Sequence, residues 1–280
     1  MKNSVNFNDK IIIALDYGDL KPVKNLLDKL EGRAFFYKVG FELFTSCGEK
    51  SVKFIKERGC KVFLDLKYHD IPNTVYKAVK AAGKLGADII NVHASGGTDM
   101  MSAAKKAAEE ASEDAGKHID IIAVTVLTSL SDGDINRIFY DYNYNDYEEV
   151  IQEKDGGYGV SKEGISSGLA MHLARLAKIS KLDGVVCSGR ESSNIKKTLG
   201  KDFKTVTPGI RTKIGSDNKI TNCADNSKDD QKRVMTPSEA FNAGADYIVI
   251  GREITGAADP AVAFDKIYTD IKDNISMQKI

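Results

Sequence analysis

Eight short apolar runs alternate with segments of helical spacing along this chain of 280 residues, and we therefore predict a (β/α)8 barrel. Each run is too short for an ordinary helix and is rich in Ile, Val or Phe, which is typical of strands buried on both faces. The length also suits a barrel, which usually needs about 250 residues. The alternative is an open doubly wound sheet, which often carries a G-x-G-x-x-G turn after its first strand. Here the first run leads into "LDYGDLKP" instead, so we favour the barrel.

The runs are expected to form the strands in chain order. They are IIIAL (11–15), FFYKV (35–39), KVFLDL (61–66), DIINV (88–92), DIIAVTV (120–126), DGVVC (183–187), FKTV (203–206) and DYIVI (246–250). Segments between them carry apolar stripes at helical spacing, which would pack on the barrel. The stripes are Leu20, Val23, Leu27 and Leu30; Met100, Ala104, Ala107 and Ala111; and Leu169, Leu173, Leu176 and Ala177. Gly59 and Gly86 stand where helices should end before the next strand.

Two intervals are longer than a barrel unit needs. We predict one domain over residues 1–280, with insertions at about 129–162 and 212–230. Both intervals follow strands and should therefore lie at the carboxyl ends of the strands, where barrels carry their active sites. We interpret them as tolerated surface insertions, with a lid or a subunit contact as the alternative.

The charge balance is even, because Lys and Arg together number 40 and Asp and Glu together number 40. A chain without net charge has no overall basic field to hold nucleic acid or an anionic membrane surface. No apolar run approaches the roughly 20 residues that span a bilayer. The four cysteines have neither metal-ligand spacing nor a dense disulfide pattern. We therefore expect a cytoplasmic protein with reduced thiols and with no nucleic-acid or membrane partner.

Charged residues stand at the predicted carboxyl ends of the strands. Asp65 and Lys67 end the third run two residues apart, so their side chains share one face. If that face points into the barrel, each buried charge needs a partner. Lys38 can pair with Asp65, and Asp70 can pair with Lys67, which would give an alternating row of lysine and aspartate. An isolated D-x-K is more often a surface ion pair, but a second lysine and a third acid favour the buried row.

A second group of residues follows the seventh and eighth runs and suggests an anion site. Loops at these positions hold phosphate groups in many barrels, and "VIGREI" supplies Gly251 and Arg252 there. "TPGIR" adds Gly209 and Arg211 at the same end of the barrel. Alone, Gly-Arg after a strand is equally typical of a packing turn. His93 ends the fourth run, and we interpret it as a structural hydrogen-bonding group and not as an acid or base.

Taken together, these motifs resemble the orotidine 5′-phosphate decarboxylase family in its bacterial, free-standing form, from about Ile11 to Ile254. The resemblance rests on ALD (14–16), YKVG (37–40), FLDLKYHDIPNT (63–74), NVHASGG (91–97), VLTS (126–129), TPGIR (207–211), QKRVMTP (231–237) and YIVIGR (247–252). The D-x-K-x-x-D pattern is highly specific in this setting. The resemblance implies a carboxy-lyase that converts orotidine 5′-monophosphate to uridine 5′-monophosphate and CO2 in de novo pyrimidine biosynthesis, without a cofactor or a metal.

The resemblance also implies roles for individual residues. Lys67 would be the catalytic proton donor, flanked by Asp65 and Asp70, with Lys38 completing the charged row. The residues expected to contact substrate are Asp16, Lys38, Thr74, Thr128, Ser129, Pro208, Arg211, Gln231, Gly251 and Arg252. The family implies a homodimer with shared active sites, in which Asp70 and Thr74 reach into the neighbouring subunit's site.

Within the substrate set, the resemblance places Asp16 and Lys38 at the ribose hydroxyls. Thr128 and Ser129 would lie beside the pyrimidine, while Arg211, Gln231, Gly251 and Arg252 would hold the phosphate region. The segment before Gln231 is longer than the family leads us to expect, so Gln231 is placed by the "KRVMTP" that follows it.

Two rival interpretations remain. Other enzymes of the same barrel group, such as hexulose-phosphate synthases and keto-gulonate-phosphate decarboxylases, resemble the chain at the first strands and the phosphate site. They use Mg2+ and differ in the strand-three motif, so "DLKYHD" argues against them. A non-catalytic nucleotide-binding or scaffold protein is disfavoured, because buried charges are costly to keep for stability alone.

Overall fold

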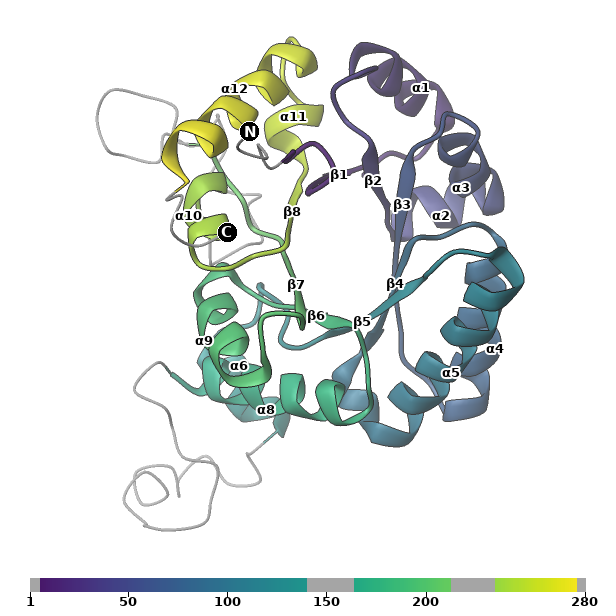
Figure 1. Cartoon of the computed structure of the whole chain (residues 1–280), viewed down its shortest axis with the longest axis vertical. Helices are drawn as coiled ribbons and strands as arrows, with labels where there is room; N and C mark the ends of the chain where they lie inside the picture. The colour runs from purple at the N-terminus through teal and green to yellow at the C-terminus, as the bar shows by residue number, and fades with distance from the viewer. Residues whose placement is uncertain (1–5, 140–163, 213–234, 276–280) are drawn as a thin grey trace, which may run out of the picture.

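The computed structural model describes residues 6–139, 164–212 and 235–275, which form a closed barrel of parallel strands (Figure 1). Neighbouring strands are consecutive in the chain, and β1 pairs with β8 to close the barrel. The strands are β1 (Ile11–Ala14), β2 (Phe36–Val39), β3 (Lys61–Tyr68), β4 (Ile89–His93), β5 (Asp120–Val124), β6 (Gly184–Val186), β7 (Lys204–Thr207) and β8 (Tyr247–Ile250). The predicted (β/α)8 fold is therefore confirmed.

Helices surround the barrel on its outside (Figure 1). They are α1 (Leu20–Lys29), α2 (Phe41–Cys47), α3 (Glu49–Lys56), α4 (Pro72–Lys84), α5 (Gly97–Ala115), α6 (Asp132–Phe139), α8 (Ile165–Ile179), α9 (Gly189–Leu199), α10 (Pro237–Asn242), α11 (Arg252–Thr255) and α12 (Pro260–Asn274), with a short 3₁₀ helix at Ala94–Gly96. The three predicted stripes fall in or at the end of α1, α5 and α8. All their residues are buried except Leu20 and Leu176, which are half-buried.

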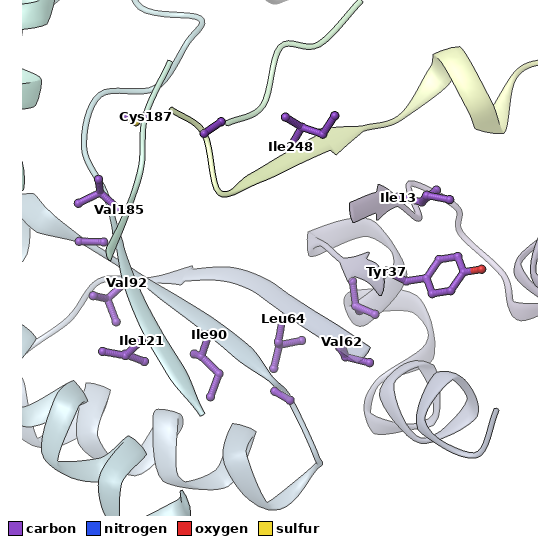
Figure 2. Packing of buried hydrophobic residues seen from close by; sticks show 14 of the residues in the cluster. Ile13, Tyr37, Val62, Leu64, Ile90, Val92, Ile121, Val185, Cys187 and Ile248 are labelled. Atoms are coloured by element: carbon purple, nitrogen blue, oxygen red, sulfur yellow. The ribbon is translucent and has the colours of Figure 1, made fainter. Parts of the chain in front are cut away.

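Strand side chains alternate between two apolar layers, as period-two geometry requires. One layer lies between strands and helices, and Figure 2 shows Leu64, Ile90 and Ile121 pointing from their strands toward the helices. The other layer fills the barrel itself. Its buried members are Ile12, Ala14, Phe36, Phe63, Ile89, Ile122, Val206 and Val249. Burying one such large side chain contributes about 1.5–3 kcal/mol, so the two layers supply much of the driving force for folding.

Local sequence signals explain where the helices begin and end. Asp19 precedes α1, and its side chain accepts a hydrogen bond from the backbone N–H of Lys21, as an N-cap should. Pro260 is the first residue of α12 and directly follows the N-cap Asp259. Gly59 and Gly86 have φ angles of 72° and 97°, a region that favours glycine, and each precedes a strand as predicted.

Two strands have an end that differs from the expected one by two residues, and the others differ by one residue at one or both ends. The third strand continues to Tyr68, past both predicted charges, and the fifth ends at Val124 instead of residue 126. The insertion predicted at 129–162 includes α6, and its residues 140–162 lie outside the described residues, as does nearly all of 212–230. In the described part of the chain, no helix has the length and apolar character needed to cross a membrane. Cys47, Cys60 and Cys187 are free thiols.

Candidate active site

A cavity of about 310 Å³ lies at the carboxyl ends of the strands, in the position that the sequence predicts. Its apolar walls are inward side chains of the strands, among them Phe63, Val124 and Val249. The predicted site residues that line it are Asp16, Lys38, Asp65, Lys67, Thr128, Pro208, Arg211, Gly251 and Arg252. Residues more than 200 positions apart in the chain therefore meet at one end of the barrel.

A row of charges forms one wall of the cavity. The Lys67 ammonium lies 2.7 Å from one oxygen of Asp65, and the Lys38 ammonium lies 3.4 Å from the other. Lys38 also donates a hydrogen bond to Asp16 at 3.2 Å. Asp65 and Lys38 are largely buried, with side chains 11% and 12% exposed, whereas Lys67 is 25% exposed and faces the cavity. The prediction that Lys38, Asp65 and Lys67 point into the barrel together is confirmed.

The environment keeps these groups charged. Burial alone would raise the pKa of Asp65, but the ammonium groups of Lys38 and Lys67 and a hydrogen bond from Asn91 outweigh it and lower that pKa. For Lys38, burial acts to lower the pKa, and the carboxylates of Asp65 and Asp16 more than compensate, so the pKa is raised. Asp65 and Lys38 are therefore ionised throughout the neutral range.

The anion site predicted after the seventh and eighth strands occupies the opposite wall. Gly251 and Arg252 follow β8 directly, and Pro208 and Gly209 follow β7. Arg211 lies beside them, and its guanidinium is 3.9 Å from Glu253. Arg211 and Arg252 thus line the cavity on the side of β7 and β8, and the lysine–aspartate row lines it on the side of β2 and β3.

Several predicted site residues do not line this cavity. Asp70 is exposed past the end of β3, and its carboxylate accepts a hydrogen bond from the backbone N–H of Ile71 at 2.7 Å. Within the described chain no ion pair joins Asp70 to Lys67, so the predicted fourth member of the row is not in place. Thr74 is exposed on α4 and Ser129 is exposed after β5. Gln231 lies outside the described residues.

The two histidines near β3 and β4 lie beside the row and not in the cavity lining. His93 is half-buried, and its ring centroid is 5.4 Å from that of His69. Burial first, and then the nearby charges of His69 and Lys67, lower the pKa of His93. The interpretation of His93 as a structural group stays a prediction.

Sequence analysis did not single out Asn91, which is buried beside the row. Its amide bonds both the side chain of Asp65 and the backbone of Lys67. The available signal was strand parity. Asn91 lies two residues before His93 on β4, so the two side chains point to the same face of the strand. A polar residue at an inward position of a barrel strand requires a partner inside the barrel.

One cluster of side chains outside the cavity has the composition of a metal-ligand group. In the described part of the chain, His118, Asp120 and Asp183 bring three ligand atoms together, at the amino ends of the strands and away from the cavity. Both carboxylates already carry an ammonium partner, from Lys204 and Lys105. These cations neutralise the group, and we assign no metal to it.

A closed (β/α)8 barrel with a cavity of lysine, aspartate and arginine side chains at its carboxyl ends defines a barrel enzyme that acts on an anionic small molecule. Comparison with known proteins agrees with this class. The sequence profile of the "Orotidine 5'-phosphate decarboxylase / HUMPS family" matches residues 9–267, and the chain belongs to that family.

Individual relatives cover nearly the whole chain. Orotidine 5'-phosphate decarboxylase of Idiomarina loihiensis is 46% identical over 266 residues, which is 94% of this chain and 97% of the relative. The protein of the same name from Saccharophagus degradans is 42% identical, covering 94% of each chain. Among solved structures, orotidine 5'-phosphate decarboxylase from Lactobacillus acidophilus superposes with a TM-score of 0.73 at 33% identity, covering 94% of this chain and 98% of its own.

Proposed function

We propose that this protein converts orotidine 5′-monophosphate to uridine 5′-monophosphate and CO2, the final step of de novo pyrimidine biosynthesis, with Lys67 as proton donor. The observation that carries the proposal is the Lys38–Asp65–Lys67 row on the wall of a cavity whose opposite wall holds Arg211 and Arg252. The row matches the chemistry of the reacting carbon, and the arginines match the phosphate of the substrate.

The reaction requires an unusual form of stabilisation. The bond that breaks joins the carboxylate to C6 of the pyrimidine ring. Its electron pair stays on C6, where no adjacent carbonyl can delocalise it. Preorganised positive charge can stabilise such a carbanion in a site that excludes water. The Lys67 ammonium supplies that charge and then transfers a proton to C6, after which the neutral amine regains a proton from solvent. Asp65, 2.7 Å from the Lys67 nitrogen, holds the ammonium in position for this step.

Groups distant from C6 would provide binding energy and orientation. Arg252 and Arg211 can hold the phosphate through charge-assisted hydrogen bonds, beside Pro208 and the backbone of Gly251. Binding energy from a remote phosphate can be used to desolvate and orient the reacting carbon. On the resemblance, Gln231 belongs to the same phosphate region.

The same placement of the substrate, with its phosphate at the arginines and C6 at Lys67, predicts its remaining contacts. Asp16 and Lys38 are hydrogen-bonded to each other at 3.2 Å and would meet the ribose hydroxyls. Thr128 lines the cavity where the pyrimidine would lie, and Ser129 is the next residue along. Both hydroxyls can donate or accept a hydrogen bond at the pyrimidine edge.

The fourth charge of the row would come from a second copy of the chain. Asp70 and Thr74 are exposed and do not line their own cavity, and the exposed Ile71 lies between them. Ile71 is 68% exposed and Phe41, whose ring lies 5.4 Å from the Lys67 ammonium, is 58% exposed. Large exposed apolar side chains beside exposed polar groups favour a subunit contact at this face. We therefore propose a homodimer in which Asp70 and Thr74 complete the partner's site.

A direct assay tests the activity. Loss of the absorbance of orotidine monophosphate should proceed without added metal and in the presence of EDTA, because no step needs a metal ion. The Lys67→Ala variant should lose this activity while remaining folded. Turnover that requires Mg2+ would instead favour a related barrel enzyme with different chemistry.

Mixed subunits test the shared site. Lys67→Ala protein is combined with Asp70→Ala protein under conditions that allow subunits to exchange. Hybrid dimers should regain activity, because one of their two sites then contains both Lys67 and Asp70. Activity that stays at the level of the separate variants would contradict the crossing of Asp70 between subunits.

A further inference from the structure

The backbone of β3 is irregular at the charged row. Leu64 pairs with Ile90 and Tyr68 pairs with Val92, so three residues of β3 stand opposite one residue of β4. Within this bulge Lys67 has a φ angle of 42°, and Lys181 is the only other non-glycine residue with positive φ among those the structure describes. Such a conformation costs a side-chain-bearing residue on the order of 1–3 kcal/mol and persists only where its surroundings impose it. Something must therefore hold Lys67 in place.

Asn91 is the β4 residue opposite the bulge. Its side chain is fully buried. Its Oδ1 accepts a hydrogen bond from the backbone N–H of Lys67 at 2.8 Å, and its Nδ2 donates one to Oδ1 of Asp65 at 2.7 Å. The orientation of the amide is dictated by its partners, because a backbone N–H only donates and a carboxylate only accepts.

One amide thus joins the two residues that form the ion pair. The Asp65 oxygen that receives the Asn91 hydrogen bond is the same atom that lies 2.7 Å from the Lys67 ammonium. Asn91 therefore constrains the Lys67 backbone on one side and the Asp65 carboxylate on the other. No other standard side chain of this size offers both a donor and an acceptor at this separation.

We propose that Asn91 is a positioning residue for the decarboxylation, holding Lys67 in its left-handed conformation and aligning the Asp65 carboxylate so that the ammonium faces the substrate carbon. The inference rests on the proposed function, whose proton donor it positions. Asn91 does not line the cavity and acts through Asp65 and Lys67. Losing it should therefore affect the chemical step more than substrate binding, which depends on Arg211 and Arg252 at the other wall.

Removal of Asn91 should also change the titration of Asp65. The groups that face this carboxylate are Lys38 from β2, with Asp16 behind it, Lys67 from β3, and Asn91 and His93 from β4. The Asn91 amide is one of the groups that favour the ionised form. Without this donor the carboxylate is less stabilised, so the pKa of Asp65 rises.

The first experiment measures steady-state kinetics of Asn91→Ala and Asn91→Asp. The first variant removes both hydrogen bonds, and the second keeps an acceptor but replaces the donor with oxygen. We expect kcat per folded molecule to fall about 100-fold, the loss typical of a reacting group displaced by an ångström. KM should change much less, and the acid limb of the pH profile should move to higher pH.

Thr205→Val is the matched control. Thr205 is also fully buried, on β7, where its hydroxyl donates to the backbone oxygen of Gly244 at 3.1 Å, outside the charged row. This variant should lose stability while its kcat and its acid limb stay at wild-type values. The control separates loss of a buried hydrogen bond from loss of the alignment of Lys67.

A second readout does not depend on activity. In substrate-free protein, the ¹³C signal of the Asp65 carboxyl, assigned by its loss in Asp65→Asn, should titrate at higher pH in both Asn91 variants. If the wild-type protein lacks decarboxylase activity, the proposed function fails, while this titration still decides whether Asn91 acts on the pair. The inference is overturned if folded Asn91→Asp has wild-type kcat and an unshifted Asp65 titration, whether or not Asn91→Ala folds.

Discussion

At the carboxyl ends of the strands, Lys38 and Lys67 flank the single buried carboxylate of Asp65. At the amino ends of the same barrel, Lys204 contacts both oxygens of Asp120, and Lys105 contacts both oxygens of Asp183. Both groups combine lysines with buried or nearly buried aspartates. They differ in their surroundings, because the carboxyl-end group lines a cavity.

The amino-end group is balanced, since each lysine has its own carboxylate and His118 lies against both acids. The carboxyl-end group lines a cavity with four cations and two carboxylates, and one of the cations, Arg211, also lies 3.9 Å from Glu253. The cations are Lys38, Lys67, Arg211 and Arg252, and the acids are Asp16 and Asp65. An excess of positive charge around a cavity is suited to a dianionic phosphate. Charged clusters inside a barrel thus indicate a substrate site where a cavity and a charge excess coincide.

The largest expected effect is on kcat, and it distinguishes the charged group at the carboxyl ends of the strands from the one at the amino ends. Lys67→Met should lower kcat by about 10²–10⁴-fold or more, the range lost when a positioned proton donor is removed. Lys204→Met, a matched change at the amino end, should leave kcat per folded molecule unaltered. It should cost about 1–2 kcal/mol of unfolding free energy, because Asp120 loses a partner that is itself one-third exposed. Kinetics and urea unfolding of both variants check this, and equal kinetic losses would refute the distinction.

A smaller effect is expected from Gly40, which follows Lys38 at the end of β2. A Cβ atom added there would lie 2.9 Å from the Lys38 ammonium, closer than van der Waals contact permits. Gly40→Ala should therefore displace the ammonium from Asp65 and lower kcat roughly 10-fold, since small displacements near the reacting groups are costly. Gly133→Ala, whose Cβ would meet nothing closer than 3.8 Å, is the control and should keep wild-type kinetics.

The smallest effect concerns acid stability. Because the pKa of Asp65 is lowered on folding, its ionised form contributes stability at pH above its unfolded value of about 3.9, and this is lost as pH falls through the folded pKa. The difference in unfolding free energy between wild type and Asp65→Asn should be constant above about pH 5. It should narrow as the pH falls toward 2. A difference that stays constant to pH 2 would show that folding does not lower the pKa of Asp65.

Much of the fold and part of the site could be predicted from local patterns. The apolar runs predicted every strand to within two residues at each end, because a strand buried on both faces requires an unbroken apolar sequence. Parity placed Asp65 beside Lys67, and strand order placed Arg252 at the same end of the barrel. The partner of Asp70 was harder to predict, because Asp70 lies past the end of β3. Beyond a strand, the alternation of side chains no longer predicts which way a side chain points.

The sequence by itself determined which residues form the barrel and which charges gather at its carboxyl ends, because alternation and chain order are local properties. Only the tertiary structure decided that β3 bulges opposite β4, that Lys67 adopts positive φ, and that Asn91 bonds both Lys67 and Asp65. It also decided that the lysines and aspartates at the amino ends pair closely, whereas those at the carboxyl ends line a cavity. These features depend on the register between neighbouring strands, which brings together residues that no local pattern relates.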